Sequence, residues 1–529
     1  MHSRLYNRIT NLFVPCLIFS AITGFFTAII TTVFKLLAEY VIHLSTSAYA
    51  AVRENPIWLP ILVAAAAALG LAAALILSIS HSCRGGGIPT SVAAIRGIFS
   101  FKWVGAILLL PISALLTFLA GLPLGTEGPC VQMGTAVGDG VISHIGGKKH
   151  KGWRRYIMTG GASAGFSIAT ASPISAIMFS IEELHKRFSP MLLSVAAMSV
   201  ISAQLTSFAL TYLGIPAMNL FAIPEIESIS LALFYAPIIV GLLTGACSIL
   251  FTNLYHLVDF LIRRALKKLR SKVVLPILFA LTAIVGFLLA SGIGTGHSLT
   301  ASLLSAHTAW YLLLLIFLVR AIAMMLANTS GATGGIFLPT LAFGAIVGAL
   351  TADGLIALGW ISPESYTLIV VLGISSFLGA TSRIPLTACI FAVEAFGGIN
   401  NIIPIVISVT VALLIVESSG SKDLTDTIIE TKLHKITNGK KSYSVEVPLT
   451  VNAESFAYGK ELNDILWPNE CVVVSFNRVD KTKKGLGLSE GDVITVHYNT
   501  FDRYETAMEL VMLVGEQPDS VIRLMLAEN

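Results

Sequence analysis

Glu127 lies between helix-breaking glycines and a proline, in the run GTEGP at 125–129, in a part of the chain where charged residues are rare. A helix that begins at such a break exposes backbone N–H groups and the positive end of its dipole, and both favour a bound anion. A carboxylate there competes with the anion for the same donors, and protonation removes the competitor. A carboxylate that caps the helix and points at water is the simpler alternative. The residue type and its position predict a proton-sensitive gate over an anion site.

The pattern around Glu127 recurs later in the chain. GIFLP at 335–339 follows GTEGP at an offset of 210 residues, and further glycines follow both blocks at the same spacing. GGG at 85–87 likewise matches GTG at 294–296, and a Pro, Ala, Phe and Glu at 173–182 match those at 385–394. Repeats with breaks in corresponding places are typical of transporters, whose sites form at the midplane from discontinuous helices of both repeats. We place the halves at about 50–215 and 230–430 and expect Glu394, the partner of Glu182, to pack between them.

The elements that position these residues are expected to be membrane helices. Apolar residues make up 55% of the 529 and charged residues only 12%, about half the charged share of a soluble domain. Uncharged apolar runs at 12–34, 56–80 and 233–250 come near or exceed the roughly 20 residues that cross a bilayer. Of the 64 charged residues, 22 fall within the last 89 positions. The sequence predicts an all-α polytopic membrane body at 1–440 and a water-exposed domain at 441–529.

Basic residues gather near the N-terminus (Arg4 and Arg8) and at 148–155 and 263–272. By the positive-inside rule these segments, and with them both termini, face the cytoplasm of a multi-pass cell-membrane protein. Membrane runs flank the clusters, so we expect no nucleic-acid partner.

The six cysteines are scattered, without the spacing of a metal site. No nucleophile or metal-ligand partner stands at a suitable spacing from Glu127, so an intramembrane enzyme is disfavoured and no cofactor is expected.

The quoted motifs together resemble the CLC family of chloride channels and chloride/proton exchangers. GGGIP at 85–89 is similar to the family's GSGIP, GTEGP to G(K/R)EGP, and GIFLP to GxFxP. The segment from Ser172 to Glu183 resembles the one that ends in the internal proton-transfer glutamate. The resemblance implies a homodimer of inverted repeats of broken helices, with one path per subunit. It implies transport of chloride or a similar small anion by exchange with protons; a passive gated channel or a leak-prone exchanger is the alternative.

The resemblance also assigns residues to the path. Glu127 would be the gate and Glu183 its inner proton partner, although Glu183 could instead pair with the basic residues at 185–187. Backbone amides would hold the anions, those of Ile336 and Phe337 at the central site and those of Thr126, Glu127 and Gly128 at the outer site.

Three positions depart from the family pattern. Gly86 replaces the serine of GSGIP, and Thr425 falls where a tyrosine closes the inner end of the path. Thr126 replaces the basic residue before the gating glutamate. Both side-chain ligands of the central anion are therefore lost or reduced, which puts chloride selectivity and tight proton coupling in doubt.

The last 89 residues read as a small α/β domain, with strands expected at 443–451, 471–477 and 493–498 and a helix at 504–515. GKELND at 459–464, the expected strand that ends at Arg478, and LSEGDV at 488–493 resemble the C-terminal domain of potassium-conductance regulators, the RCK_C domain. That resemblance implies a dimeric regulatory module, and we expect cyclic di-AMP to bind near Asn477 and Arg478. A purely structural dimerisation domain is the alternative.

Overall fold

The computed structural model describes residues 14–85, 87–145, 152–216, 220–221, 226, 233–266, 271–397, 399–437, 442–468, 471–479, 487–501 and 503–526. Gly86, which the sequence assigned to the anion path, lies outside the described residues. So do Arg4 and Arg8 and parts of the basic clusters at 146–151 and 267–270.

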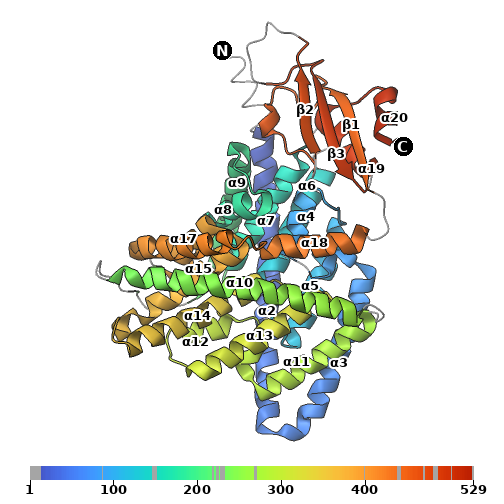
Figure 1. Ribbon diagram of the computed structural model, residues 1–529. Coiled ribbons are helices and arrows are strands. Elements are labelled where there is room, and N and C mark those ends of the chain that lie inside the picture. Colours follow the sequence, from blue (N-terminus) through green and yellow to red (C-terminus); the bar gives the residue numbers. More distant parts are fainter. Residues whose placement is uncertain are drawn as a thin grey trace.

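Helices build the body of the protein (Figure 1). The first half contains α2 (Val14–Glu54), α3 (Leu59–Ile79), α4 (Ile88–Ile95), α5 (Trp103–Leu119), α6 (Glu127–His144), α7 (Arg154–Thr170), α8 (Pro173–Phe179), the π-helix η5 (Ser180–His185) and α9 (Pro190–Tyr212). The second half contains α10 (Tyr235–Leu266), α11 (Ser271–Leu288), α12 (His297–Leu303), α13 (Trp310–Ser330), α14 (Phe337–Ala357), α15 (Tyr366–Ser382), α16 (Pro385–Phe396), α17 (Ile402–Ser418) and α18 (Leu424–Thr437). Within the described part of the chain, eight helices are long and apolar enough to cross a membrane.

The two halves break their helices in the same way. The loops before α4 and α12 hold glycines with positive φ at matched places: Gly85 and Gly87 in the first half, Gly294 and Gly296 in the second. An L side chain rarely adopts that backbone conformation, so the repeated glycines permit the repeated turn. The loops before α6 and α14 meet directly, because Gly125 and Gly335 exchange two backbone hydrogen bonds of 2.7 Å as an isolated antiparallel bridge. The predicted repeat thus appears as a symmetric contact between its halves.

Small residues let the central helices approach closely. Gly134 of α6 and Gly161 of α7 lie so near each other that a Cβ on either would overlap the other's backbone carbonyl. Gly344 of α14 and Gly373 of α15 make the corresponding contact in the second half. In a bilayer, where lipid is as apolar as the side chains, such close backbone packing is a main source of helix association.

The tail forms a three-stranded antiparallel sheet of order β1-β3-β2, made by β1 (Tyr443–Thr450), β2 (Cys471–Asn477) and β3 (Val493–Thr500). Two helices follow, α19 (Arg503–Val514) and α20 (Asp519–Leu526). Val447, Leu449 and Val496 are fully buried in its core. The predicted strands and helix are found, with β3 two residues longer than expected.

The tail packs on the membrane body at the ends of α2, α6, α7 and α9 (Figure 1). The rings of Trp153 and Phe456 meet edge to face at 4.8 Å. Glu509 of α19 pairs with Arg155 and lies 3.8 Å from Arg154. Arg155 Nη1 also donates to the Trp467 carbonyl at 2.6 Å. Apolar and ionic contacts therefore join the tail to the start of α7.

Candidate functional site

Three helix N-termini converge at one point in the body. A Cβ built on Gly128, in the first turn of α6, would lie 2.7 Å from Gly335 Cα before α14 and 3.1 Å from Gly87 Cα before α4. The first N–H groups of a helix have no partner within it, and they carry the positive end of the dipole. Three such ends at one buried point make a site that attracts negative charge.

Glu127 begins α6 at this point and is completely buried. Its Oε1 accepts a hydrogen bond of 3.1 Å from Thr126 Oγ1. The backbone N–H groups of Glu127 and Leu338 lie near the carboxylate, although Oε2 forms no full hydrogen bond with any described residue. The carboxylate therefore lies where an anion would meet amides from both repeats, and it does not point at open water.

The start of α14 supplies the other side of the site. Ile336 is the residue before the helix and Phe337 its first residue, and both are buried. The Phe337 ring packs edge to face against Phe166 of α7 at 5.0 Å and Phe391 of α16 at 5.4 Å. Rings from both repeats thus pack around Phe337, one of the two residues whose amides the sequence assigned to the central anion.

A cavity of about 640 Å³ leads to Glu127 and Thr126. Lys35 of α2 lines it, and its Nζ donates to the Ala169 carbonyl at 2.9 Å at the end of α7. Arg320 of α13 also lines it and is 1% exposed. Sequence reasoning missed both cations. An ionisable residue within a membrane helix is itself a functional signal, and that signal could have identified them.

Glu183 lies in the π-helix η5 and is 2% exposed. The Thr425 hydroxyl of α18 lies within reach of its carboxylate. Its Oε2 has no hydrogen-bond partner among the described residues. A π-helical turn often marks a functional position, because it turns a side chain out of the regular helical register. The structure thus brings together two residues that the sequence had assigned to different steps of transport.

The basic residues beside Glu183 have other partners. Lys186 pairs with Asp423 and, at 2.6 Å, with Asp426. His185 Nε2 lies 2.8 Å from the Thr159 hydroxyl. Within the described part of the chain Glu183 makes no ion pair, so the alternative in which it is bound to this basic group finds no support.

Glu182 and Glu394 cap each other's helices across the repeat. Glu182 accepts hydrogen bonds from the Leu386 amide at 3.0 Å and the Thr387 amide at 2.7 Å, at the start of α16. Glu394, near the end of α16, accepts from the amides of Ile174 and Ser175 at 2.8 Å each, at the start of α8. The structure thus gives Glu394 the packing role between the halves that the sequence predicted, and Glu182 has the same role.

Repeated broken helices, meeting at a buried site that favours anions, define a membrane transport protein built from two inverted halves. The chain belongs to the voltage gated chloride channel (CLC) family: the match to that family covers residues 68–417, more than half of the chain. The H(+)/Cl(-) exchange transporter ClcA of Vibrio cholerae is 27% identical over 401 residues, which are 74% of this chain and 83% of that protein.

Solved structures have the same fold. A slow cyanobacterial Cl−/H+ antiporter matches with a TM-score of 0.72 and 22% identity, over 79% of this chain and 98% of that one. A CLC-type fluoride/proton antiporter matches with a TM-score of 0.65 and 20% identity, over 77% of this chain and 97% of that one. The predicted all-helical CLC fold is confirmed.

Proposed function

We propose that this protein exchanges chloride for protons across the cell membrane and that Glu127 is its gate. The observation that carries the proposal is the position of the Glu127 carboxylate, near amides from both repeats and at the end of a cavity. An anion can take this place only when the carboxylate leaves it. The names of the related exchangers, ClcA among them, support chloride and protons as the substrates.

Protonation couples the two substrates at this point. A neutral carboxylic acid competes for N–H donors much less strongly than a carboxylate, so the side chain leaves the site and an anion enters. When the anion departs, the empty site favours the carboxylate again and the proton is released. Glu183 exchanges protons with the side of the membrane opposite to the Glu127 cavity, and Thr425 holds its carboxylate in position. Ile336, Phe337, Thr126 and Gly128 contribute the amides along the path.

The Glu127→Gln variant tests this assignment. An amide side chain resembles the protonated acid, so chloride flux in liposomes should persist with weaker pH dependence, and coupled proton movement should stop. Glu39→Gln is a matched control, because Glu39 lines the same cavity but is exposed. It should retain proton coupling. Proton pumping by Glu127→Gln would show that another group carries the proton.

The protein functions as a homodimer with both termini in the cytoplasm. The resemblance to the CLC family supports the dimer. The contact between the tail and the start of α2 supports a common side for the two ends of the chain, and the basic residues Arg154 and Arg155 at the same end of the body support the cytoplasmic side.

The tail, residues 441–529, regulates transport as an RCK_C-like domain that binds cyclic di-AMP. Its contact with α7 supports the regulatory role, because α7 packs closely on α6, the helix that carries Glu127. A ligand can change flux only through different affinities for two states of the protein. Calorimetric titration of the full-length protein with cyclic di-AMP tests binding, and chloride flux with and without the nucleotide tests regulation. Arg478→Ala should weaken both the binding and the effect on flux. Absence of binding would leave the tail a structural domain.

A further inference from the structure

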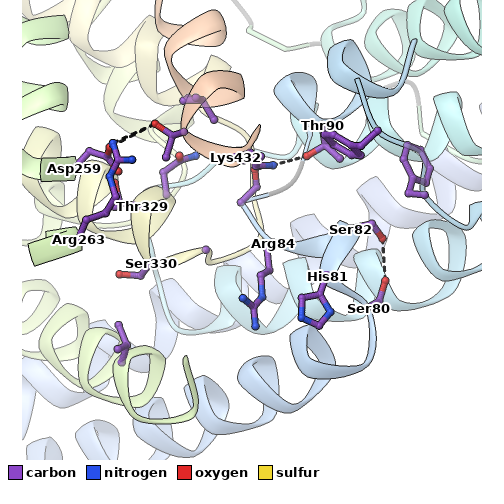
Figure 2. A pocket seen from close by; sticks show the side chains of 18 of the residues that line it. Ser80, His81, Ser82, Arg84, Thr90, Asp259, Arg263, Thr329, Ser330 and Lys432 are labelled. Atoms are coloured by element: carbon purple, nitrogen blue, oxygen red, sulfur yellow. Dashed lines mark hydrogen bonds and ion pairs between the residues drawn. The ribbon is translucent and has the colours of Figure 1, made fainter. Parts of the chain in front are cut away.

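Another cavity, of about 870 Å³, lies beside the glycine loop that precedes α4 (Figure 2). Its charged lining is mostly basic, with Arg84, Lys102, Arg263 and Lys432 against one carboxylate, that of Asp259. Asp259 is already paired with Arg263. A recess lined by charges of one sign concentrates ions of the opposite sign, so this cavity favours anions.

Lys432 is the lysine that reaches the glycine loop from α18 (Figure 2). Its Nζ donates to the Gly85 carbonyl at 3.1 Å and to Thr90 Oγ1 at 2.5 Å. Thr90 is 1% exposed and lies in the first turn of α4, the helix that starts after Gly87. Because Thr90 Oγ1 accepts a hydrogen bond from the lysine, its own hydroxyl proton points elsewhere and can be donated to an anion.

This chain lacks both side-chain anion ligands of the family pattern, the serine and the tyrosine. Position 86 is a glycine and offers no hydroxyl, and the Thr425 hydroxyl lies beside Glu183. Lys432 follows Thr425 by seven residues, about two turns of the same helix, and so projects from the same face of α18. Arg84 lines the cavity as well, and its buried Nε has no hydrogen-bond partner among the described residues.

We infer that Lys432 and Thr90 bind the transported anion at the α4 end of the path, where Lys432 supplies the positive charge and Thr90 the hydroxyl donor. The inference rests on the proposed anion transport. It also accounts for how this chain retains an anion site without the serine and the tyrosine of the family pattern. A Lys–Thr pair gives a full charge where two hydroxyls would give only dipoles, so binding here depends on ionic strength more than hydroxyl ligation does.

Chloride flux of the full-length protein in liposomes tests the pair, with chloride varied on each side in turn. Lys432→Met should raise the half-saturating chloride concentration on the cavity side by about tenfold or more, because a nearby unit charge is lost. Lys432→Arg keeps the charge and should stay within about threefold of the unaltered protein. Thr90→Val, which removes only the hydroxyl, should give an intermediate increase. Lys422→Met is the matched control, because Lys422 precedes the same helix but is exposed and paired with Glu430.

Equal half-saturating concentrations for Lys432→Met and Lys422→Met would overturn the inference and leave the proposed function intact. So would a fall in melting temperature with unchanged chloride dependence, because that result indicates a purely structural lysine. Calorimetric titration of the detergent-purified protein with chloride and bromide is independent of transport. If the unaltered protein carries no flux but binds chloride, and Lys432→Met binds it more weakly, the site stands and the proposed function fails. If neither binds chloride and Thr90→Val leaves flux unchanged, the site is wrong.

Discussion

Glu182 and Glu183 are neighbours in sequence, yet the structure predicts opposite outcomes for their removal. Glu182 accepts two amide hydrogen bonds and one from the Thr387 hydroxyl at 2.7 Å. Glu183 makes no ion pair within the described part of the chain. We expect Glu182→Gln to lower stability while leaving proton coupling unchanged. Glu183→Gln should abolish coupling with little loss of stability.

The expected loss of unfolding free energy in Glu182→Gln follows from the hydrogen bonds that the variant cannot make. A glutamine presents one oxygen and one NH2 group to three donors, so at least one donor at the start of α16 is left unpaired. A hydrogen bond to a charged group contributes about 1.5–3 kcal/mol, and a helix N-cap about 0.5–2 kcal/mol. We therefore expect a loss of about 1–3 kcal/mol for Glu182→Gln. Glu394→Gln removes the corresponding cap on α8 and should cost a similar amount, since it also accepts two amide bonds.

The assay is thermal unfolding of the full-length protein in detergent, together with the ratio of chloride to protons moved in liposomes. Glu182→Gln and Glu394→Gln should both lower the melting temperature at an unchanged ratio. The fall in melting temperature of the double variant should differ from the sum of the two single falls, because both caps join the same pair of helices, α8 and α16. Loss of coupling in Glu182→Gln equal to that in Glu183→Gln would refute the division of roles drawn here.

Three further variants test other contacts. Gly128→Ala would place a Cβ 2.7 Å from the backbone of the other repeat; we expect chloride flux to be lost, whereas Gly354→Ala, with open space around it, should transport normally. Lys35→Met removes a cation from the cavity that leads to Glu127, and should raise the half-saturating chloride on that side by about tenfold, with rescue by Lys35→Arg. Glu509→Gln breaks the ion pair of the tail with α7; hydrogen exchange at residues 153–156 should become faster, and unchanged exchange would show that apolar contacts alone hold the tail.

The sequence predicted the repeat because glycine and proline patterns are local. Gly125 and Gly335 were matched by their motifs and spacing, and the structure adds a contact that the sequence did not predict, two hydrogen bonds between them. The same reasoning placed Glu127 at a helix start, since a break followed by an apolar segment marks that point without reference to the rest of the chain. The strands of the tail were also expected from the sequence, and the structure has them within two residues of the expected ends.

Other parts of the site depend on segments far apart in the chain. The contact of Lys432 with Gly85 and Thr90 spans more than 340 residues, and that of Lys35 with Ala169 spans 134. No local pattern records which apolar helices lie side by side, so a cation's partners follow only from the three-dimensional arrangement. The position of Thr425 beside Glu183 depends in the same way on the packing of α18 against η5.

The central claim is that chloride and protons move through this protein as coupled substrates. The most direct test is the reversal potential of the purified full-length protein in liposomes, measured with a fixed chloride gradient while the proton gradient is varied. Our account predicts that the reversal potential shifts with the proton gradient and departs from the chloride equilibrium potential. A reversal potential that stays at the chloride equilibrium potential, whatever the pH difference, would contradict exchange and show a passive anion channel.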